Sequence, residues 1–240
     1  GLWYLGIALR GFRAVMASPA RLRVTGRILL STVSTQSLAL LAWHLWPGAD
    51  WLRAPVAGLI VLGYLFYAAG LALIVQRYLR ERQWTLADDW DNTNCILHGA
   101  MSISGLAIAY TGVLPEWLGI ATWLYVLVVL IAVEAVEIAR MVQRIGRYGL
   151  HRGVLTYHVS QWSRNFTFGM FYAFTLALAP AFASHPALSP FAAFAGGLFA
   201  WGPYLVLFFL LAELGLWIAA NVEFGAKKTL PRKASSSMSI

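Results

Sequence analysis

Six long apolar runs follow one another along the chain, with polar segments between them. They extend over residues 27–46, 55–79, 94–113, 116–139, 162–182 and 191–220. A helix needs about 20 residues to cross the ~30 Å hydrocarbon core of a bilayer, and every run is at least that long. The pattern therefore predicts an all-α, polytopic integral membrane protein, a helical bundle with six full transmembrane helices.

The boundaries of this transmembrane domain, residues 27–222, come from prolines and polar residues. The fifth and sixth helices share an uncharged stretch, which we divide at residues 185–190 because Pro186 and Pro190 fit a turn better than a helix interior. Residues 1–26 are expected to form a partial or interfacial N-terminal helix and a cytoplasmic loop, since residues 1–16 are too short and too basic for a complete span. Residues 223–240 are expected to form a basic cytoplasmic tail with a disordered, serine-rich end.

Basic residues mark one side of the predicted domain. The chain has 18 lysines and arginines, and all of them except Arg53 lie at one end of the predicted helices or beyond that end. The positive-inside rule makes this side cytoplasmic and indicates a protein of the cell (inner or plasma) membrane. Trp90 and Trp162 lie near the same boundary, where tryptophan commonly anchors a helix.

Composition excludes several classes of function. Hydrophobic residues make up 60% of the chain and charged residues 12%, whereas globular proteins have about 25% charged residues. The net charge of +8 is explained by orientation in the membrane, so no nucleic-acid partner is needed. The single cysteine excludes a multi-cysteine zinc site. No phosphate loop, nucleophile elbow or dinucleotide fingerprint occurs, which excludes a soluble-type enzyme. A small membrane-embedded enzyme that uses Glu134 or Glu213 as its acid stays open, and no metal site is predicted.

The six predicted helices form three hairpins of similar design, about 60 residues apart in the sequence. The first helix of each hairpin opens with a polar run, at residues 31–37, 91–94 and 160–165. The second helix is strongly apolar, and in two hairpins it ends in arginines. Internal repeats of this kind are common in channels and transporters, although inert structural subunits have them too.

This rhythm resembles the tellurite-resistance, C4-dicarboxylate and slow-anion-channel family, whose members have five hairpins around a central pore lined by the first helix of each pair. The segments that look like pore-side helices are STQSLALLAWHL, NTNCILHGAMSISGLA and SQWSRNFTFGMFYAFTLAL. The resemblance implies transport of small anions or organic acids. It also implies a pore-blocking phenylalanine near mid-membrane, which in this chain would be Phe168 or Phe171. The family has ten helices, and this chain has six or seven.

Ionisable residues within the predicted spans are the sharpest local signals, because each is costly in a bilayer unless it is paired or hydrated. Glu134 and Glu137 lie on one face of the fourth span, where Glu137 is expected to pair with Arg140. Glu213 lies deeper than Glu134, in the sixth span, and Arg164 enters the fifth span on the same side. We therefore expect a cluster of Glu213, Arg164 and Glu134. This cluster is either a structural ion pair or part of a proton or ion pathway. Unpaired carboxylates would favour cations, whereas carboxylates paired with Arg164 would permit anions.

Polar side chains at the heads of the three repeated helices are candidates to line the cytoplasmic half of a pathway. We expect this role for Ser34, Asn94 and Ser163. Small residues on the same helices are expected to leave the lumen open: Gly99, Ser102, Gly105 and Gly169. The acidic run before Asn94 is expected to provide the N-cap of the third span, at Asp91 or Asn92.

Histidines support an alternative interpretation. His98 and His158 lie in or near two of the repeated helices, and a haem or bacteriochlorophyll can be held by an axial histidine. The chain would then be an accessory or cofactor-holding subunit of a respiratory or photosynthetic complex. The simpler interpretation is that His98 forms a hydrogen bond with a neighbouring residue and that no cofactor is bound. In either case we expect a lipid bilayer around the protein, and either a homo-oligomer or membership of a larger complex.

Overall fold

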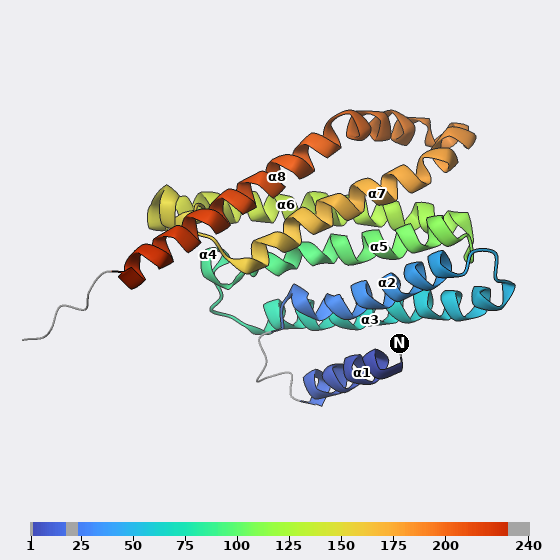
Figure 1. The fold of residues 1–240 in the computed structure, drawn as a ribbon, viewed down its shortest axis with the longest axis horizontal. Helices are drawn as coiled ribbons and strands as arrows, with labels where there is room; N and C mark the ends of the chain where they lie inside the picture. Colours follow the sequence, from blue (N-terminus) through green and yellow to red (C-terminus); the bar gives the residue numbers. More distant parts are fainter. Residues whose placement is uncertain (1, 18–23, 230–240) are drawn as a thin grey trace, which may run out of the picture.

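Each of the six apolar runs forms a helix in the computed structural model, which describes residues 2–17 and 24–229. The long helices are α1 Leu2–Ala17, α2 Leu30–Leu45, α3 Arg53–Arg80, α5 Ile96–Thr111, α6 Glu116–Gly153, α7 Trp162–Ser184 and α8 Ser189–Thr229, and the short α4 is Leu86–Asp89. The helices from α2 to α8 lie side by side in one bundle, and α1 is drawn apart from them (Figure 1). Short 3-10 turns precede five of them: η1 Gly26–Leu29, η2 Asp50–Leu52, η3 Asn92–Cys95, η4 Val159–Gln161 and η5 Pro186–Leu188. Within the described ranges no β-strand occurs, so the predicted all-α class is confirmed.

Five of the six predicted spans are long and apolar enough to cross a membrane, by length and composition. They are Gly26–Leu45, Asp50–Arg80, Glu116–Gly153, Val159–Ser184 and Pro186–Val222. The third predicted span differs, because its α-helix, α5, has 16 residues. At 1.5 Å per residue it is about 24 Å long, shorter than a typical hydrocarbon core.

Local chemistry sets both ends of α5. The Asp91 carboxylate accepts the backbone N–H of Thr93 at 2.9 Å, so Asp91 caps the η3 turn that leads into the helix. At the other end Gly112 adopts φ +60°, a left-handed conformation that glycine tolerates and that stops the helix. The expected N-cap is therefore Asp91, and the polar residues after it form a turn instead of the first turn of the α-helix.

α5 lies at the centre of the bundle and packs against α2, α3, α6 and α7. Close packing depends on its small residues: a Cβ on Gly99 would overlap the Thr167 methyl, and a Cβ on Gly105 would overlap the ring of Phe174. The prediction that Gly99 and Gly105 leave a lumen open is therefore wrong, because α7 fills both positions. Ser102 is fully buried and donates a hydrogen bond to the His98 carbonyl at 2.8 Å, so it faces no lumen either.

The polar head of the first hairpin also serves packing. Thr32 donates a hydrogen bond to the carbonyl of Gly63 at 3.2 Å, and Gln36 donates one to the carbonyl of Ile60 at 3.0 Å. Both donors are fully buried between α2 and α3. Side chains of the polar run at residues 31–37 thus form hydrogen bonds between the two helices of the first hairpin.

Two helices extend well beyond their apolar runs. α6 continues to Gly153, with a break at Gly149, where φ is +74°. The guanidinium of Arg144 donates to the carbonyl of Gly153 at 2.9 Å and so holds the end of this extension. α8 continues to Thr229, so the predicted tail begins as helix, and residues 230–240 lie outside the described part of the chain.

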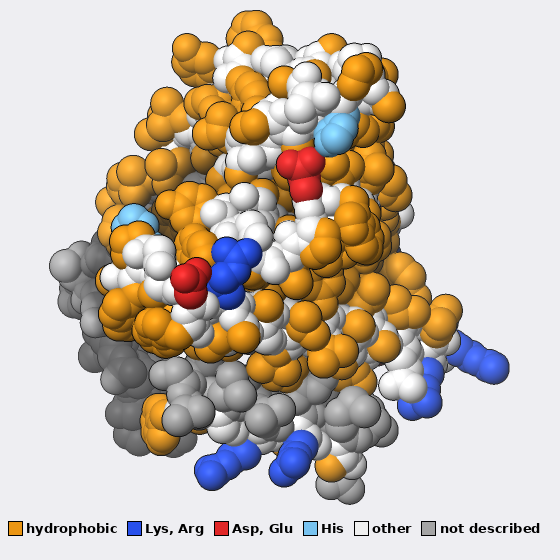
Figure 2. Space-filling model, turned by 90° about the vertical axis from the view of Figure 1, so that its right-hand side faces the viewer, with side chains coloured by type: hydrophobic (Ala, Val, Ile, Leu, Met, Phe, Trp, Pro, Cys, Tyr) orange, Lys and Arg blue, Asp and Glu red, His pale blue; other side chains and the backbone are white. Residues whose placement is uncertain are grey.

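The two ends of the bundle have different chemistry. The starts of α2, α5 and α7 and the ends of α3 and α6 meet at one end of the bundle, where arginines of α3, α6 and α7 lie. Polar contacts join these segments, such as the bond from Arg77 to the Val24 carbonyl, 2.8 Å. We call this end of the bundle the arginine-rich end. The opposite end shows mostly hydrophobic side chains and few charged ones (Figure 2). One of its few polar contacts joins His185 to Glu116 at 3.1 Å.

Candidate functional site

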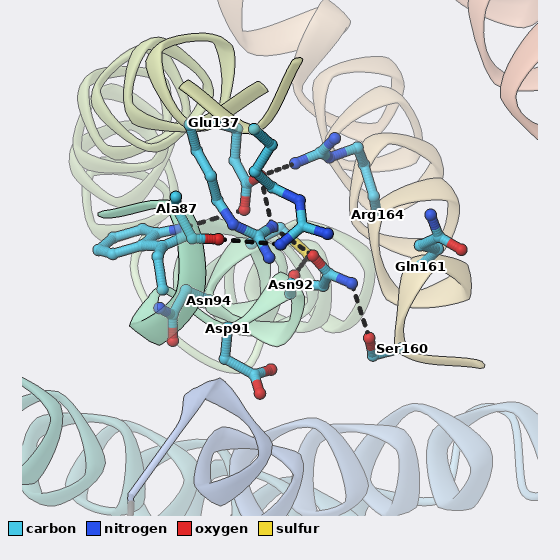
Figure 3. A network of polar contacts seen from close by, with 12 residues as sticks. Ala87, Asp91, Asn92, Asn94, Glu137, Ser160, Gln161 and Arg164 are labelled. Carbon is cyan, nitrogen blue, oxygen red and sulfur yellow. Dashed lines mark hydrogen bonds and ion pairs between the residues drawn. The ribbon is translucent and has the colours of Figure 1, made fainter. Parts of the chain in front are cut away.

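Glu137 is the centre of a buried network at the arginine-rich end (Figure 3). It is 6% exposed, and three side chains from different elements converge on its carboxylate. Arg164 on α7 approaches Oε2 to 2.7 Å, Arg140 on α6 approaches Oε2 to 3.4 Å, and the indole N–H of Trp90 donates to Oε1 at 2.9 Å. The ion pair between Glu137 and Arg140, expected from their spacing, is present, but the shorter one is made with Arg164.

The network continues from Arg140 toward the loops that precede α5 and α7. Arg140 donates a hydrogen bond to the side-chain carbonyl of Asn92, whose amide donates to Ser160 Oγ at 2.9 Å. These bonds join three segments that are distant in the sequence (Figure 3). Asn92 was expected only as a possible helix cap, so its bridging role was not predicted.

A second group of contacts lies around Glu134, one helical turn from Glu137. Glu134 Oε1 lies 3.9 Å from His98 Nε2 and 3.8 Å from Arg164 Nε, too far for a hydrogen bond with either. All three atoms are buried without a hydrogen-bond partner, and so is His98 Nδ1. Buried polar groups are nearly always hydrogen-bonded, so these atoms need a specific explanation. We call His98, Glu134, Glu137, Arg140 and Arg164 the buried charge cluster.

Glu213 on α8 is a neighbour of this cluster. Its Oε2 atom is buried without a hydrogen-bond partner, and Arg164 is near enough to act on it electrostatically. The expected group of Glu213, Arg164 and Glu134 is thus brought to one region by α8, α7 and α6. Arg164 directs its shortest contact to Glu137 instead.

The three polar residues expected to line a pathway have partners within the chain. Ser34 Oγ donates to the carbonyl of Leu30 at 2.8 Å, and Ser163 Oγ donates to the carbonyl of Ser160 at 2.6 Å. Asn94 is fully buried; it accepts the backbone N–H of Gly26 at 3.1 Å and donates to the Tyr78 hydroxyl at 2.8 Å. Asn94 therefore joins α2, α3 and α5, and the structure gives it a packing role.

The two candidate phenylalanines differ in environment. Phe171 is 3% exposed and stacks on Trp123 with ring centroids 6.0 Å apart, so it belongs to the hydrophobic core. Phe168 is partly exposed and lies between His98, at 6.0 Å, and Phe209, at 5.3 Å. Of the two, Phe168 alone borders the buried charge cluster.

The histidines offer little room for a macrocycle. The His98 side chain is fully buried, and the glycines beside it on α5 are filled by Thr167 and Phe174, so the surrounding residues do not fit a haem or bacteriochlorophyll there. The Nδ1 of His158 accepts the backbone N–H of Ser160 at 3.2 Å and caps the η4 turn. Among residues 2–17 and 24–229, no group of three or more His, Cys, Asp or Glu side chains could hold a metal ion.

Trp90 is the functional-site residue that sequence reasoning missed most clearly. Its position suggested an interfacial anchor, yet its indole N–H is directed at the buried Glu137 carboxylate. The run of three aspartates around it was the available signal, because a tryptophan in a strongly polar segment often uses its N–H for a specific hydrogen bond.

No protein-family model, curated protein sequence or solved structure matches this chain. The buried charge cluster and the length and apolar composition of the helices are therefore the observations that bear on function.

Proposed function

We propose that this chain is an integral membrane transport protein, a channel or transporter, that carries small anions or organic acids. In this proposal six helices, α2, α3 and α5–α8, cross the membrane as three hairpins, and the arginine-rich end is cytoplasmic. The five long apolar helices support membrane insertion. α5 is short, but it is enclosed by four other helices, so it does not have to match the bilayer thickness by itself.

The observation that carries the proposal is the buried charge cluster. Four ionised side chains and a histidine lie together in an apolar bundle, although each charge in a membrane costs several kcal/mol unless it is fully compensated. A cluster with only a structural role would be expected to use all its hydrogen-bonding atoms. This one leaves atoms of His98, Glu134 and Arg164 without partners.

Arg164 is the proposed anion-attracting group. Its Nη2 is held by Glu137, while its Nε has no hydrogen-bond partner and its side chain is 30% exposed. A guanidinium offers a planar set of donors suited to carboxylates and other oxyanions. On the same helix, Gly169 has open space where a side chain would be, because a Cβ there would have no atom within 4 Å.

Flux measurements on the purified chain in liposomes test this proposal. The wild-type protein should carry chloride, nitrate or a small dicarboxylate faster than protein-free vesicles, and Arg164→Gln should lose most of that flux. Arg147→Gln is the matched control, because Arg147 is half-exposed and pairs with Asp88 at 2.6 Å, away from the cluster. Absence of anion flux in the wild type, or full flux in Arg164→Gln, would contradict the proposal.

The exposed face of α8 is the surface on which we expect lipid or a further subunit. No side chain between residues 203 and 222 is buried, and Tyr204 and Phe208 are 68% and 64% exposed. A helix that is apolar on its outer face suits a hydrocarbon environment. Homo-oligomer formation on this face is part of the proposal and is tested by the mass of the protein in native lipid particles.

A further inference from the structure

Glu134 has two competing partners. Its Oε1 lies 3.9 Å from His98 Nε2 and 3.8 Å from Arg164 Nε, and it forms a hydrogen bond with neither. A small rotation of the side chain would bring it into hydrogen-bond range of one partner or the other. The three atoms therefore form a branch point with two alternative arrangements.

The charges around this branch point are of both signs. Arg140 and Arg164 are positive, with Arg144 near enough to act on Arg140, and Glu134, Glu137 and Glu213 are negative when ionised. Since uncompensated charge is costly in a low-dielectric interior, a negative charge added to this group is accommodated best when a positive charge is added with it. His98 belongs to the same cluster, and its two ring nitrogens have no hydrogen-bond partner.

Other elements packed against α5 offer no competing charge for His98. α2 contributes the neutral side chains Thr32, Thr35 and Gln36. Tyr67 on α3 donates its hydroxyl proton to the Leu97 carbonyl, and Cys95 in η3 contacts Ser163. Arg27 in η1 pairs with Asp91 at 3.7 Å. Glu134 from α6 and, through it, Arg164 from α7 are therefore the charged groups that decide the state of His98.

We propose that His98 and Glu134 form a binding site for one proton, and that its occupancy decides whether Arg164 is free to bind an anion. When the proton is absent, His98 is neutral and the Glu134 carboxylate interacts with Arg164. With the proton, the Nε2–H of the imidazolium donates to Glu134 Oε1 and draws this carboxylate toward α5. Arg164 then keeps Glu137 but loses Glu134, and its Nε can meet an incoming anion.

The electrostatic balance supports joint binding of the proton and the anion. An anion beside Arg164 adds one negative charge, and the proton at His98 adds one positive charge, so together they leave the net charge of the cluster unchanged. Transport should therefore increase as the pH on the side of the arginine-rich end falls. The proton site stands on the cluster geometry alone, whereas its effect on transport rests on the proposed function.

Nitrogen NMR of histidine-labelled full-length protein tests the proton site without any transport assay. Between pH 5 and 8, the range in which histidine changes its charge, the His98 ring signals should move. In Glu134→Gln the pH dependence of these signals should differ from that of the wild type, because the variant lacks the carboxylate to which the imidazolium would donate. His151→Gln is the control, because His151 is exposed and its loss should leave the His98 titration unchanged.

The His98 signal can be assigned even if no His98 variant folds. The chain has five histidines, so single replacements of the other four identify His98 by elimination. A His98 signal that stays constant over this pH range, or that titrates identically in Glu134→Gln, would overturn the proton site.

Flux at several internal pH values tests the link to transport. Wild-type anion flux should rise as pH falls, by up to about tenfold per pH unit, the limit for one bound proton. Glu134→Gln should lose this pH dependence while it still carries anions, because Arg164 has no competing carboxylate. A pH-dependent flux that is equal in Glu134→Gln and wild type would overturn the link but leave transport itself established, whereas no flux in either protein would count against the proposed function.

Discussion

At the residue scale, Glu137 is held both by a residue of its own helix, Arg140, and by Arg164 from the neighbouring helix α7. The Glu137–Arg140 pair follows from a spacing of three residues, which places both side chains near one face of α6. The stronger contact to Arg164 depends on how α6 and α7 are rotated relative to each other, and no local pattern encodes that rotation. The same is true of the bond from Trp90 to Glu137.

Trp90→Phe tests the energetic weight of this bond. A smaller aromatic ring remains, but Glu137 loses the N–H donor at 2.9 Å, so we expect destabilisation by about 1.5–3 kcal/mol, typical of a hydrogen bond to a charged group. Denaturant unfolding in detergent would measure it. Trp84→Phe is the control, because Trp84 is more exposed and packs edge-on against Tyr78, a contact that phenylalanine can keep. Equal stability losses in the two variants would contradict this interpretation of Trp90.

Asp88 provides a pH-dependent test outside the membrane helices. The hydroxyl of Tyr148 donates a hydrogen bond to Asp88 at 2.7 Å, and this bond, with Arg147 nearby, lowers the pKa of the carboxyl below its usual value. A lowered pKa in the folded state means that the contribution to stability is present above the pKa of the unfolded chain. That contribution is lost as the pH falls through the folded-state pKa.

Tyr148→Phe should therefore be less stable than wild type at neutral pH, by a small amount because Asp88 is exposed. The difference should disappear in acid, where Asp88 is protonated in both proteins. Melting temperatures recorded along a pH series would show this convergence. A stability difference that stays constant down to acidic pH would contradict the assignment to Asp88.

At the scale of single elements, run length and proline position predicted the helices well. The break between α7 and α8 lies at His185–Leu188, where it was expected. Helix ends were predicted less well in α6, where polar residues continue the helix beyond its apolar run. Hydrophobicity marks the apolar run, and it does not show where the helix itself ends. The small residues of α5 were recognised, but their role was misjudged, because the same composition suits an open lumen and close helix packing.

Gly105→Ala tests the packing role directly. The new methyl group would overlap the Phe174 ring, which is fully buried and cannot move without disturbing the core. Overpacking of this kind costs about 1–3 kcal/mol, seen as a lower unfolding midpoint. Gly215→Ala on α8 has no atom within 4 Å of the new Cβ, so it should be neutral or slightly stabilising. If both variants behave alike, α5 and α7 are not in close contact at Gly105 and Phe174.

At the scale of the whole molecule, the charge asymmetry of the sequence corresponds to a physical end of the bundle. The arginines that flank the apolar runs meet at one end and form the polar network around Glu137, while the opposite end is mostly hydrophobic. Orientation in a membrane follows from this asymmetry as a proposal. The buried charge cluster could be predicted in outline from Glu134, Glu213 and Arg164, but His98 joins it only through the fold.

Labelling from one side of the membrane tests the orientation. In a Cys95→Ala background, Asp50→Cys should react with an impermeant maleimide added outside intact cells, whereas Arg147→Cys should react only after the cells are permeabilised. Both positions are exposed or half-exposed in the structure, so access from solvent is not limited by packing. External labelling of Arg147→Cys would reverse the proposed topology.

The most direct test of the central claim is anion efflux from liposomes that contain the purified wild-type protein, Arg164→Gln or Arg147→Gln. The account predicts efflux from the wild-type and Arg147→Gln vesicles, and efflux close to that of protein-free vesicles for Arg164→Gln. Unchanged efflux through Arg164→Gln, with folding verified by the same helical content as wild type, would contradict the role of the buried charge cluster in transport.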